Sequence, residues 1–224
     1  NSLKLHFSRV YLPNIMNNLY DFFLNSSEEM NKKEIKLIKR VPVNGINFIN
    51  TDGMRLYQIF MKLIHNSVKF TKVGQIEFGY RKLNKNYNRF FVKDTGIGIS
   101  ADKYDLIFKS FRQADESLNR SYGGNGLGLS IAKALVQRMG GKLCLESETG
   151  QGSLFYFDLP IEDISKNELK KNTVSKLQGF YDWSDKKILI VEDIYINYFL
   201  LKEFLKKTKA IVIPANTGQS ALEV

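Results

Sequence analysis

The sequence has few of the features that mark secreted or membrane-spanning proteins. Its single cysteine, Cys144, excludes a disulfide bond within the chain and favours a reducing compartment. No run of about 18 apolar residues is present to cross a bilayer, and the chain does not open with a secretory leader. We therefore expect a cytoplasmic location, with no membrane contact from this part of the protein.

An excess of one charge is present, but it is not gathered into a tract. Lys and Arg number 33 against 23 Asp and Glu, which gives a net charge of +10. Because these basic residues are scattered and no nucleic-acid-binding motif accompanies them, we expect no nucleic-acid partner. A nucleic-acid binder stays an alternative on charge alone, and a polyanionic nucleotide would also suit a basic surface.

Composition divides the 224 residues into three parts. Residues 1–160 carry helical and strand patterns, whereas residues 161–186 are polar and charged, which is typical of a linker. The remaining part, residues 187–224, begins with an apolar run that predicts a buried parallel strand. A helix, a strand and the start of another helix follow, so this part reads βαβα, as at the opening of a doubly wound fold.

The clearest helical pattern lies in residues 55–71. Its apolar line predicts a buried stripe: Leu56, Ile59, Phe60, Leu63, Ile64, Ser67 and Val68. A second line on this helix is polar: Arg55, Gln58, Lys62, Asn66 and Lys69. A solvated face is the ordinary interpretation of that line. Asn66 argues for a function instead, because Asn is a mediocre helix former with no capping role in mid-helix.

An acidic residue follows the strand pattern of residues 89–93. The sequence there is Asp94-Thr95-Gly96-Ile97-Gly98-Ile99, so a carboxylate faces a cleft and two glycines let a flat ligand approach the backbone. We predict a short helix over Ser100–Phe111, capped by Ser100. The polar residues 112–122 then suit either a mobile lid or an ordinary surface loop.

Two glycine-rich turns complete the pattern. Gly123-Gly124-Asn125-Gly126-Leu127-Gly128-Leu129 leads directly into a predicted helix. Glycine permits close backbone approach, and a helix N-terminus offers free N–H groups to an anion, so this turn is a candidate phosphate cradle. Similar turns also occur without a ligand. The second turn, residues 148–152, joins the predicted strands 142–147 and 153–159 in a hairpin.

These segments, in this order, resemble the sequence boxes of the ATP-binding catalytic domain of sensor histidine kinases. The resemblance covers about residues 3–160 and rests on the N box, the first glycine box, the F box, the second glycine box and a final glycine motif, at residues 55–71, 94–99, 107–111, 123–129 and 150–153. Residues 187–224 resemble the opening of a response-regulator receiver domain. A kinase followed by a receiver is the layout of a hybrid histidine kinase.

The resemblance implies an α/β fold, namely an α+β two-layer sandwich with a mixed sheet and helices on one face, in residues 1–160. A linker over 161–186 and a truncated receiver over 187–224 follow. The implied enzyme is a protein-histidine kinase that binds ATP with Mg²⁺ and transfers the γ-phosphoryl group to a histidine for relay to a receiver aspartate. Its expected partners are the histidine-bearing dimerisation domain of a longer parent protein, there a homodimer, and a receiver domain.

The resemblance also assigns site residues. Asp94 accepts a hydrogen bond from the adenine amine, where guanine has a carbonyl oxygen. Asn66 binds Mg²⁺ through its side-chain oxygen, Lys69 reaches a phosphate, and either Arg112 or Arg120 neutralises charge on the γ-phosphate. Further nucleotide contacts are expected from Gly96, Gly98, Ile99, Gly124, Gly126, Leu127, Gly128, Leu129, Ser153 and Phe155.

The receiver-like part implies a second magnesium site. Glu192 and Asp193 match the acidic pair that binds Mg²⁺ in receiver domains. The phosphoacceptor aspartate of that family would follow a third strand, beyond Val224. We therefore expect the receiver site to be incomplete in this chain, which begins without a methionine and is expected to be part of a longer protein.

Three residues depart from the family pattern. His6 and His65 lack the context of the family's phosphoacceptor, so we expect that this chain does not phosphorylate itself. Lys62 stands where the N box usually has Asn and where related ATPases have Glu as a general base, which disfavours hydrolysis of that type. Lys62 would either meet a phosphate or weaken the metal site. The alternative function is therefore a degenerate nucleotide-binding or docking module without kinase activity.

Overall fold

The computed structural model describes residues 4–26, 34–43, 47–104, 106–108, 127–160, 182–192, 198, 201–202, 205 and 208–222. The chain divides into two compact units, Asn1–Asp163 and Ile164–Val224. The elements described in the first unit are β1 (Ser8–Tyr11), α1 (Leu12–Ser26), β2 (Ile35–Arg40), β3 (Phe48–Thr51), α3 (Gly53–Phe70), β4 (Gly74–Lys82), β5 (Tyr87–Asp94), the 3₁₀ helix η1 (Ala101–Lys103), α5 (Gly128–Arg138), β6 (Leu143–Glu148) and β7 (Gly152–Pro160).

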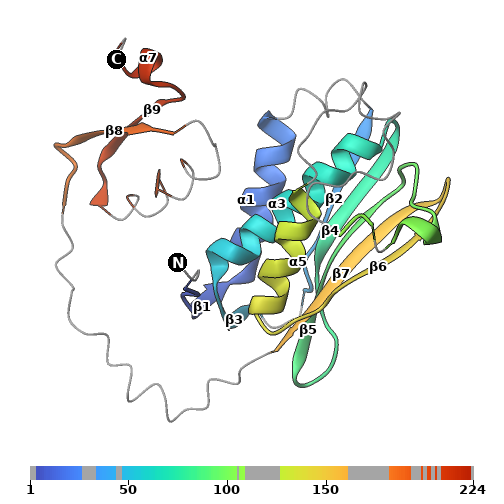
Figure 1. Ribbon diagram of the computed structural model, residues 1–224. Helices are drawn as coiled ribbons and strands as arrows, with labels where there is room; N and C mark the ends of the chain where they lie inside the picture. The colour runs from blue at the N-terminus through green and yellow to red at the C-terminus, as the bar shows by residue number, and fades with distance from the viewer. Residues whose placement is uncertain are drawn as a thin grey trace. The chain divides into compact units, whose positions relative to one another are not determined.

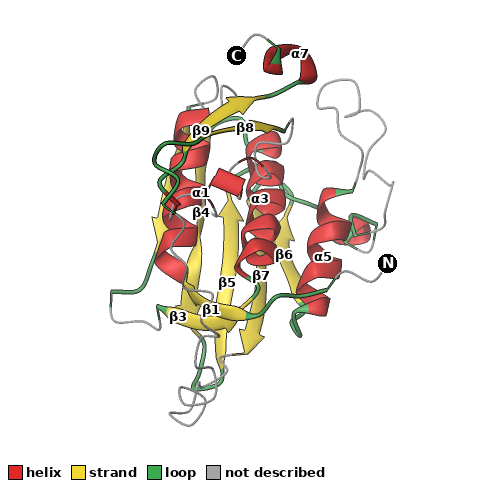
Figure 2. Ribbon diagram, turned by 90° about the vertical axis from the view of Figure 1, so that its left-hand side faces the viewer, coloured by secondary structure: helices red, strands yellow, loops and turns green. Residues whose placement is uncertain are grey.

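The first unit is a two-layer α/β sandwich, as the sequence predicted. Its main sheet has the strand order β2-β4-β5-β7-β6, with β2 parallel to β4 and the other neighbours antiparallel. Helices α1, α3 and α5 cover one face of this sheet (Figures 1 and 2). A separate antiparallel pair joins β1, which directly precedes α1, to β3, which directly precedes α3.

Helix α3 packs on the sheet through the predicted apolar stripe, all seven members of which are buried. At its centre the ring of Phe60 lies 6.2 Å from those of Phe78 and Phe90 and 6.0 Å from that of Phe157. These aromatic contacts join the helix to three adjacent strands, so the position of α3 along the sheet is well determined by packing.

The N-terminus of α3 is fixed by Asp52. Its Oδ1 accepts a hydrogen bond from the backbone N of Arg55 at 3.1 Å, which is an ordinary N-cap. Its Oδ2 accepts from the backbone N of His6 at 2.9 Å. The same side chain therefore caps the helix and holds the segment that precedes β1.

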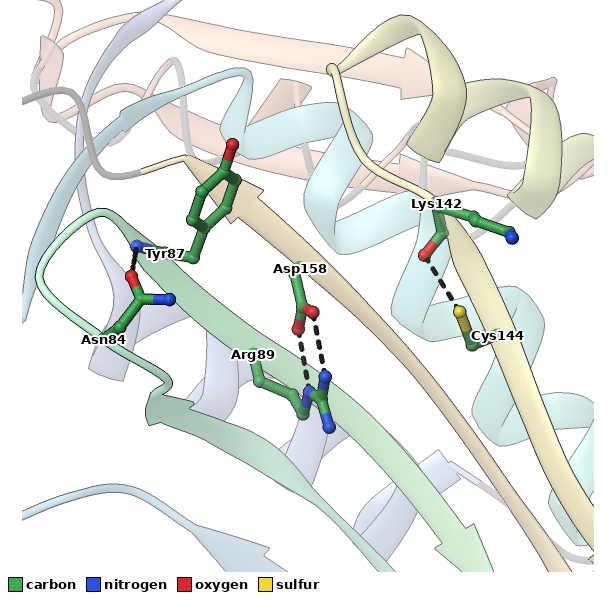
Figure 3. A network of polar contacts seen from close by, with 6 residues as sticks. All are labelled: Asn84, Tyr87, Arg89, Lys142, Cys144 and Asp158. Atoms are coloured by element: carbon green, nitrogen blue, oxygen red, sulfur yellow. Dashed lines mark hydrogen bonds and ion pairs between the residues drawn. The ribbon is translucent and has the colours of Figure 1, made fainter.

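The face of the sheet opposite the helices carries a polar network. Arg89 on β5 donates to both carboxylate oxygens of Asp158 on β7, at 2.8 and 2.9 Å (Figure 3). The free thiol of Cys144 on β6 contacts the backbone oxygen of Lys142 at 3.8 Å. The two hydrogen bonds between Arg89 and Asp158 align β5 with β7, the two strands that carry the candidate site.

The predicted helix over Ser100–Phe111 is wrong in its described part. Only Ala101–Lys103 form a short 3₁₀ helix, and Ser100 makes no side-chain cap hydrogen bond. The hydroxyl of Tyr104 instead bonds to the backbone of Ser147 on β6. This contact joins Tyr104 to a strand, and the residues described after it, 106–108, form turns.

The second unit contains β8 (Lys187–Val191), β9 (Ile211–Ala215) and the short helix α7 (Gly218–Ala221) (Figure 1). The two strands pair in parallel. The side chain of Thr217 caps α7 by accepting from the backbone N of Ser220 at 3.1 Å. In the part of the chain that the structure describes, no helix is long and apolar enough to cross a membrane.

Candidate functional site

Asp94 is the candidate site residue that the structure defines best, because its carboxylate is buried and held from three directions. Only 5% of the residue is exposed at the end of β5. Its Oδ1 accepts from the backbone N of Gly96 at 2.9 Å and of Ser153 at 3.2 Å. Its Oδ2 accepts from the hydroxyl of Ser67 on α3 at 2.9 Å. The helix, the following loop and strand β7 thus all orient one side chain.

The charge state of Asp94 reflects two opposing effects. Burial raises the pKa of this carboxyl above its ordinary value, and the hydrogen bonds from Gly96, Ser67 and Ser153 oppose the rise. An ionised carboxylate accepts about four hydrogen bonds, two at each oxygen. Among the described residues Oδ1 has two donors and Oδ2 has one, so an accepting position at Oδ2 remains for a further donor. The site therefore suits a ligand that donates one hydrogen bond.

The glycines that follow Asp94 are required by the packing of the protein itself. A Cβ on Gly96 would lie 2.5 Å from the backbone oxygen of Phe70. Gly98 has a φ of +69°, and a Cβ there would lie 1.9 Å from the backbone oxygen of Glu148. Both distances are far below van der Waals contact, so the loop lies directly against α3 on one side and the β6–β7 turn on the other. Their predicted contact with a ligand stays a prediction.

Backbone hydrogen bonds fix the same loop in place. The N of Ile97 donates to the oxygen of Phe70 at 3.2 Å, and the N of Gly150 donates to the oxygen of Ile97 at 2.8 Å. The N of Ile99 donates to the hydroxyl of Ser147 at 2.8 Å. The loop next to Asp94 is therefore held by hydrogen bonds to the end of α3, to β6 and to the β6–β7 turn.

Helix α3 brings the predicted metal-binding residue to this place. Asn66 is half-buried and directly precedes Ser67, whose hydroxyl contacts Asp94. Lys69, also half-buried, has its ammonium group 5.0 Å from the centre of the Phe70 ring. The polar line of α3 and the carboxylate of β5 thus belong to the same region of the first unit.

The N-terminus of α5 has the properties expected of an anion site. Its first residue is Gly128, its first turn contains no acidic side chain, and Leu127 at the N-cap position makes no side-chain hydrogen bond. Leu127 therefore offers no side-chain cap to the N–H groups of that turn. Among the described residues, no atom lies within 4 Å of a Cβ placed on Gly128, so the backbone here is open to close approach.

The remaining predicted site residues fall into two groups. Ile99, Leu127 and Leu129 are half-buried, and Phe155 is buried in the core. The others lie outside the described residues: Arg112, Arg120, Gly124, Gly126 and Asp193. Glu192 is described, and its backbone N donates to the oxygen of Ala215 at 2.9 Å. Within the described ranges there is no group of three or more His, Cys, Asp and Glu side chains that could hold a metal ion.

Sequence reasoning missed three residues that shape the site: Ser67, Ser147 and Tyr104. A polar residue within the apolar stripe of α3 was the available signal for Ser67, because a buried hydroxyl needs a partner. The 148–152 turn places Ser147 opposite Ser153, which was the available signal for their contact. No sequence pattern indicated the role of Tyr104, because its partner is the backbone of a strand that is distant in sequence.

Comparison with known proteins agrees with this arrangement. The family described as histidine kinase-, DNA gyrase B-, and HSP90-like ATPase matches residues 51–163, which include α3, Asp94, α5 and the β6–β7 hairpin. The chain belongs to this ATPase family. Its curated relatives include proteins described as sensors. The autoinducer 2 sensor kinase/phosphatase LuxQ of Vibrio vulnificus (strain CMCP6) is 40% identical over 180 residues, which are 78% of this chain and 21% of LuxQ.

A second relative is similar over more of the chain. The aerobic respiration control sensor protein ArcB of Escherichia coli (strain K12) is 29% identical, over 98% of this chain and 31% of ArcB. The chain therefore spans about a fifth of the length of LuxQ and a third of the length of ArcB.

Solved structures share the ATPase-family fold. Full-length ShkA in complex with AMPPNP has a TM-score of 0.61 and 24% identity, over 100% of this chain and 44% of ShkA. The nucleotide-free catalytic domain of the histidine kinase ThkA has a TM-score of 0.58 and 23% identity, over 70% of this chain and 98% of that domain. At these identities the likeness concerns the fold, which is that of the histidine kinase ATPase domain.

Proposed function

We propose that the first unit is the ATP-binding catalytic domain of a hybrid histidine kinase. It binds Mg-ATP and transfers the γ-phosphoryl group to a histidine on a dimerisation domain outside this chain, for relay to a receiver aspartate. The observation that carries the proposal is the buried carboxylate of Asp94, which has one free accepting position at Oδ2. The exocyclic amine of adenine is the donor that fits it.

The other roles follow from position along the same elements. Asn66, next to the Asp94 contact on α3, offers an amide oxygen to Mg²⁺, and Lys69 offers a cation to a phosphate. The first N–H groups of α5, with the glycines before them, receive phosphate oxygens. Arg112 or Arg120 neutralises charge on the γ-phosphate. Contacts to the base come from Ser153, Ile99, Leu129, Phe155, Gly96 and Gly98.

Phosphoryl transfer depends more on positioning of the reactants than on a protein side chain that acts as a base. Bound ATP supplies the phosphoryl group, and catalysis of its transfer rests on alignment and charge neutralisation. Asp94 orients the base, α3 and the N-terminus of α5 bind the charged end, and the loop after Asp94 packs against the end of α3 and the β6–β7 turn. Lys62, when protonated, does not activate water, which favours transfer over hydrolysis.

We assign the second unit to the opening of a receiver domain, with domain boundaries at 1–160, 161–186 and 187–224. The parallel pairing of β8 and β9 and the ArcB similarity over 98% of this chain support this assignment. Glu192 and Asp193 are its proposed magnesium ligands. The proposed partners are the parent's homodimeric dimerisation domain and a receiver, with this part of the protein in the cytoplasm.

Replacement of Asp94 by Asn tests the ATP site directly. Asn has the same shape, and the Ser67 hydroxyl can reverse to accept from the new amide, so the fold should persist. The amide would then present a donor to the adenine amine, and we expect Mg-ATP binding to be lost, by about a hundredfold or more. Isothermal titration calorimetry measures the affinity, and thermal unfolding is the control for folding. Undiminished affinity in Asp94→Asn would refute the assignment of Asp94.

A degenerate module without kinase activity is the second candidate, and Lys62 is the observation that favours it. Incubation of this chain with labelled ATP and a matched dimerisation domain separates the two functions. Label on the histidine of that domain excludes the inactive module. ATP binding without any label transfer, when a Lys62→Asn variant does transfer, would assign the defect to Lys62.

A further inference from the structure

Three polar side chains form a row across adjacent strands of the sheet. Asp94 on β5 is paired with Ser153 on β7, and Ser153 is paired with Ser147 on β6. Cross-strand partners point to the same face of a sheet. Asp94 contacts Ser67 of α3, so this is the face that the helices cover. The row therefore lies in the region that we assign to the base.

Ser147 is the centre of a hydrogen-bond network within this row. Its hydroxyl accepts from the backbone N of Ile99 at 2.8 Å and donates to the backbone oxygen of Gly152 at 2.8 Å. A third contact, of 2.9 Å, joins it to the hydroxyl of Ser153. A serine hydroxyl has one proton to donate and two lone pairs to accept, so these three contacts use its full capacity.

Only one arrangement of protons satisfies all three contacts together. The N–H of Ile99 can only donate, and the carbonyl of Gly152 can only accept, so the proton of Ser147 points to Gly152. The contact between the two hydroxyls must then be a donation from Ser153 to Ser147. This leaves Ser153 with no proton for any other partner, and its two lone pairs can only accept.

The position of Ser147 is itself fixed from outside the sheet. The backbone N of Ser147 donates to the hydroxyl of Tyr104 at 2.9 Å, and that hydroxyl also donates to the backbone oxygen of Ser147. Ser153 is 7% exposed, so little solvent is present to offer its hydroxyl another acceptor. The orientation of the Ser153 proton is therefore determined by the protein.

We propose that Ser147 is a specificity-determining residue, which makes the hydroxyl of Ser153 an obligate acceptor beside Asp94 and so selects a 6-amino purine over a 6-oxo purine. The inference rests on the proposed ATP site. With Ser147 in place, both Asp94 and Ser153 present acceptors, which match the amine of adenine. A 6-oxo purine presents a carbonyl oxygen there, and no proton is available to meet it.

Replacement of Ser147 by Ala frees the proton of Ser153 to turn toward the base. We expect the preference for ATP over inosine triphosphate, measured as the ratio of the two dissociation constants, to fall about threefold to tenfold, the worth of one neutral hydrogen bond. Inosine triphosphate is the suitable probe because it lacks the 2-amino group of GTP. If Ser147 had a structural role alone, its replacement would weaken the binding of both nucleotides equally. An unchanged ratio of the two dissociation constants would therefore overturn the proposal.

Three further variants complete the experiment. Ser153→Ala removes the oriented hydroxyl, so the ratio should fall there too, and adding Ser147→Ala to it should change the ratio no further. Ser147→Thr retains a hydroxyl and should retain the wild-type ratio. If Ser147→Ala does not fold, an unchanged ratio in Ser153→Ala alone refutes the proposal. If the wild-type chain binds neither nucleotide, the proposed function fails, and this inference fails with it.

Discussion

The two glycine-rich segments of the site differ in what their glycines contact. After Asp94, Gly96 and Gly98 lie so close to backbone oxygens of Phe70 and Glu148 that a side chain would not fit. At the start of α5, a Cβ on Gly128 would meet no described atom within 4 Å. Glycine in the first segment is thus required by the fold, whereas no described atom around Gly128 requires it.

The largest effect is expected for Gly98→Ala. The substitution places a Cβ 1.9 Å from the backbone oxygen of Glu148, at a φ of +69° that side chains rarely adopt. Because backbone on both sides must move, we expect the free energy of unfolding to fall by about 3 kcal/mol or more. Urea denaturation of Gly98→Ala and of the wild type measures this loss.

Gly150→Ala is the matched control. Gly150 lies in the neighbouring turn with a φ of +83°, but no described atom lies within 4 Å of its Cβ position. Backbone strain alone should cost about 1 kcal/mol. If both variants lost the same stability, close packing would not be the reason for glycine at position 98, and the contrast between the two segments would lose its main support.

Much of the structure around Asp94 was predictable because the sequence patterns that indicate it are local. The helical spacing in 55–71 predicted the buried stripe of α3, and the strand pattern before Asp94 placed that carboxylate at a strand end. The 148–152 turn predicted the β6–β7 hairpin, in which Gly150 and Gly152 both have positive φ. In each case the residues that determine the structure are close together in sequence.

The rest depends on contacts between distant residues, which a pattern does not contain. Ser67 was assigned to an apolar stripe, and its bond to Asp94 arises only when α3 packs on β5. The segment after Ser100, where a helix was predicted, instead makes a contact between Tyr104 and Ser147, 43 residues away. Strand β3 was not predicted either, because Phe48–Thr51 is short and its pairing with β1 joins segments separated by α1 and β2.

We expect the free energy of unfolding and the ATP affinity to depend on pH through the titration of Asp94. Burial raises the pKa of Asp94 above its unfolded value, so the folded state binds the proton more tightly. At pH values above the pKa of Asp94 in the folded state, the ionised carboxylate therefore lowers the free energy of unfolding. This destabilisation disappears as the pH falls from the folded-state pKa toward the ordinary carboxyl pKa of 3.8. ATP binding should follow the opposite course, since it needs the ionised acceptor.

Stability curves of the wild type and Asp94→Asn over the acidic range measure the first effect. Their difference should change between the raised pKa and the ordinary carboxyl value, with wild-type stability gaining on the variant as the pH falls. Calorimetric titration of the wild type in the same buffers should show the ATP affinity falling over that range. A difference that does not vary with pH would show that the hydrogen bonds fully offset the burial of Asp94.

The smallest effect on stability is expected for Gly128→Ala, at the start of α5. Ala is the better helix former and meets no described atom there, so the free energy of unfolding should change by less than about 0.5 kcal/mol. If phosphate oxygens approach this backbone, the added methyl group should weaken Mg-ATP binding about tenfold, or ~1.4 kcal/mol. Gly218→Ala is the matched control, because Gly218 is also the first residue of a helix with open space around it, in the second unit. Loss of ATP affinity in Gly128→Ala alone would show that the glycine serves the ligand; equal affinities in both variants would place the phosphates elsewhere.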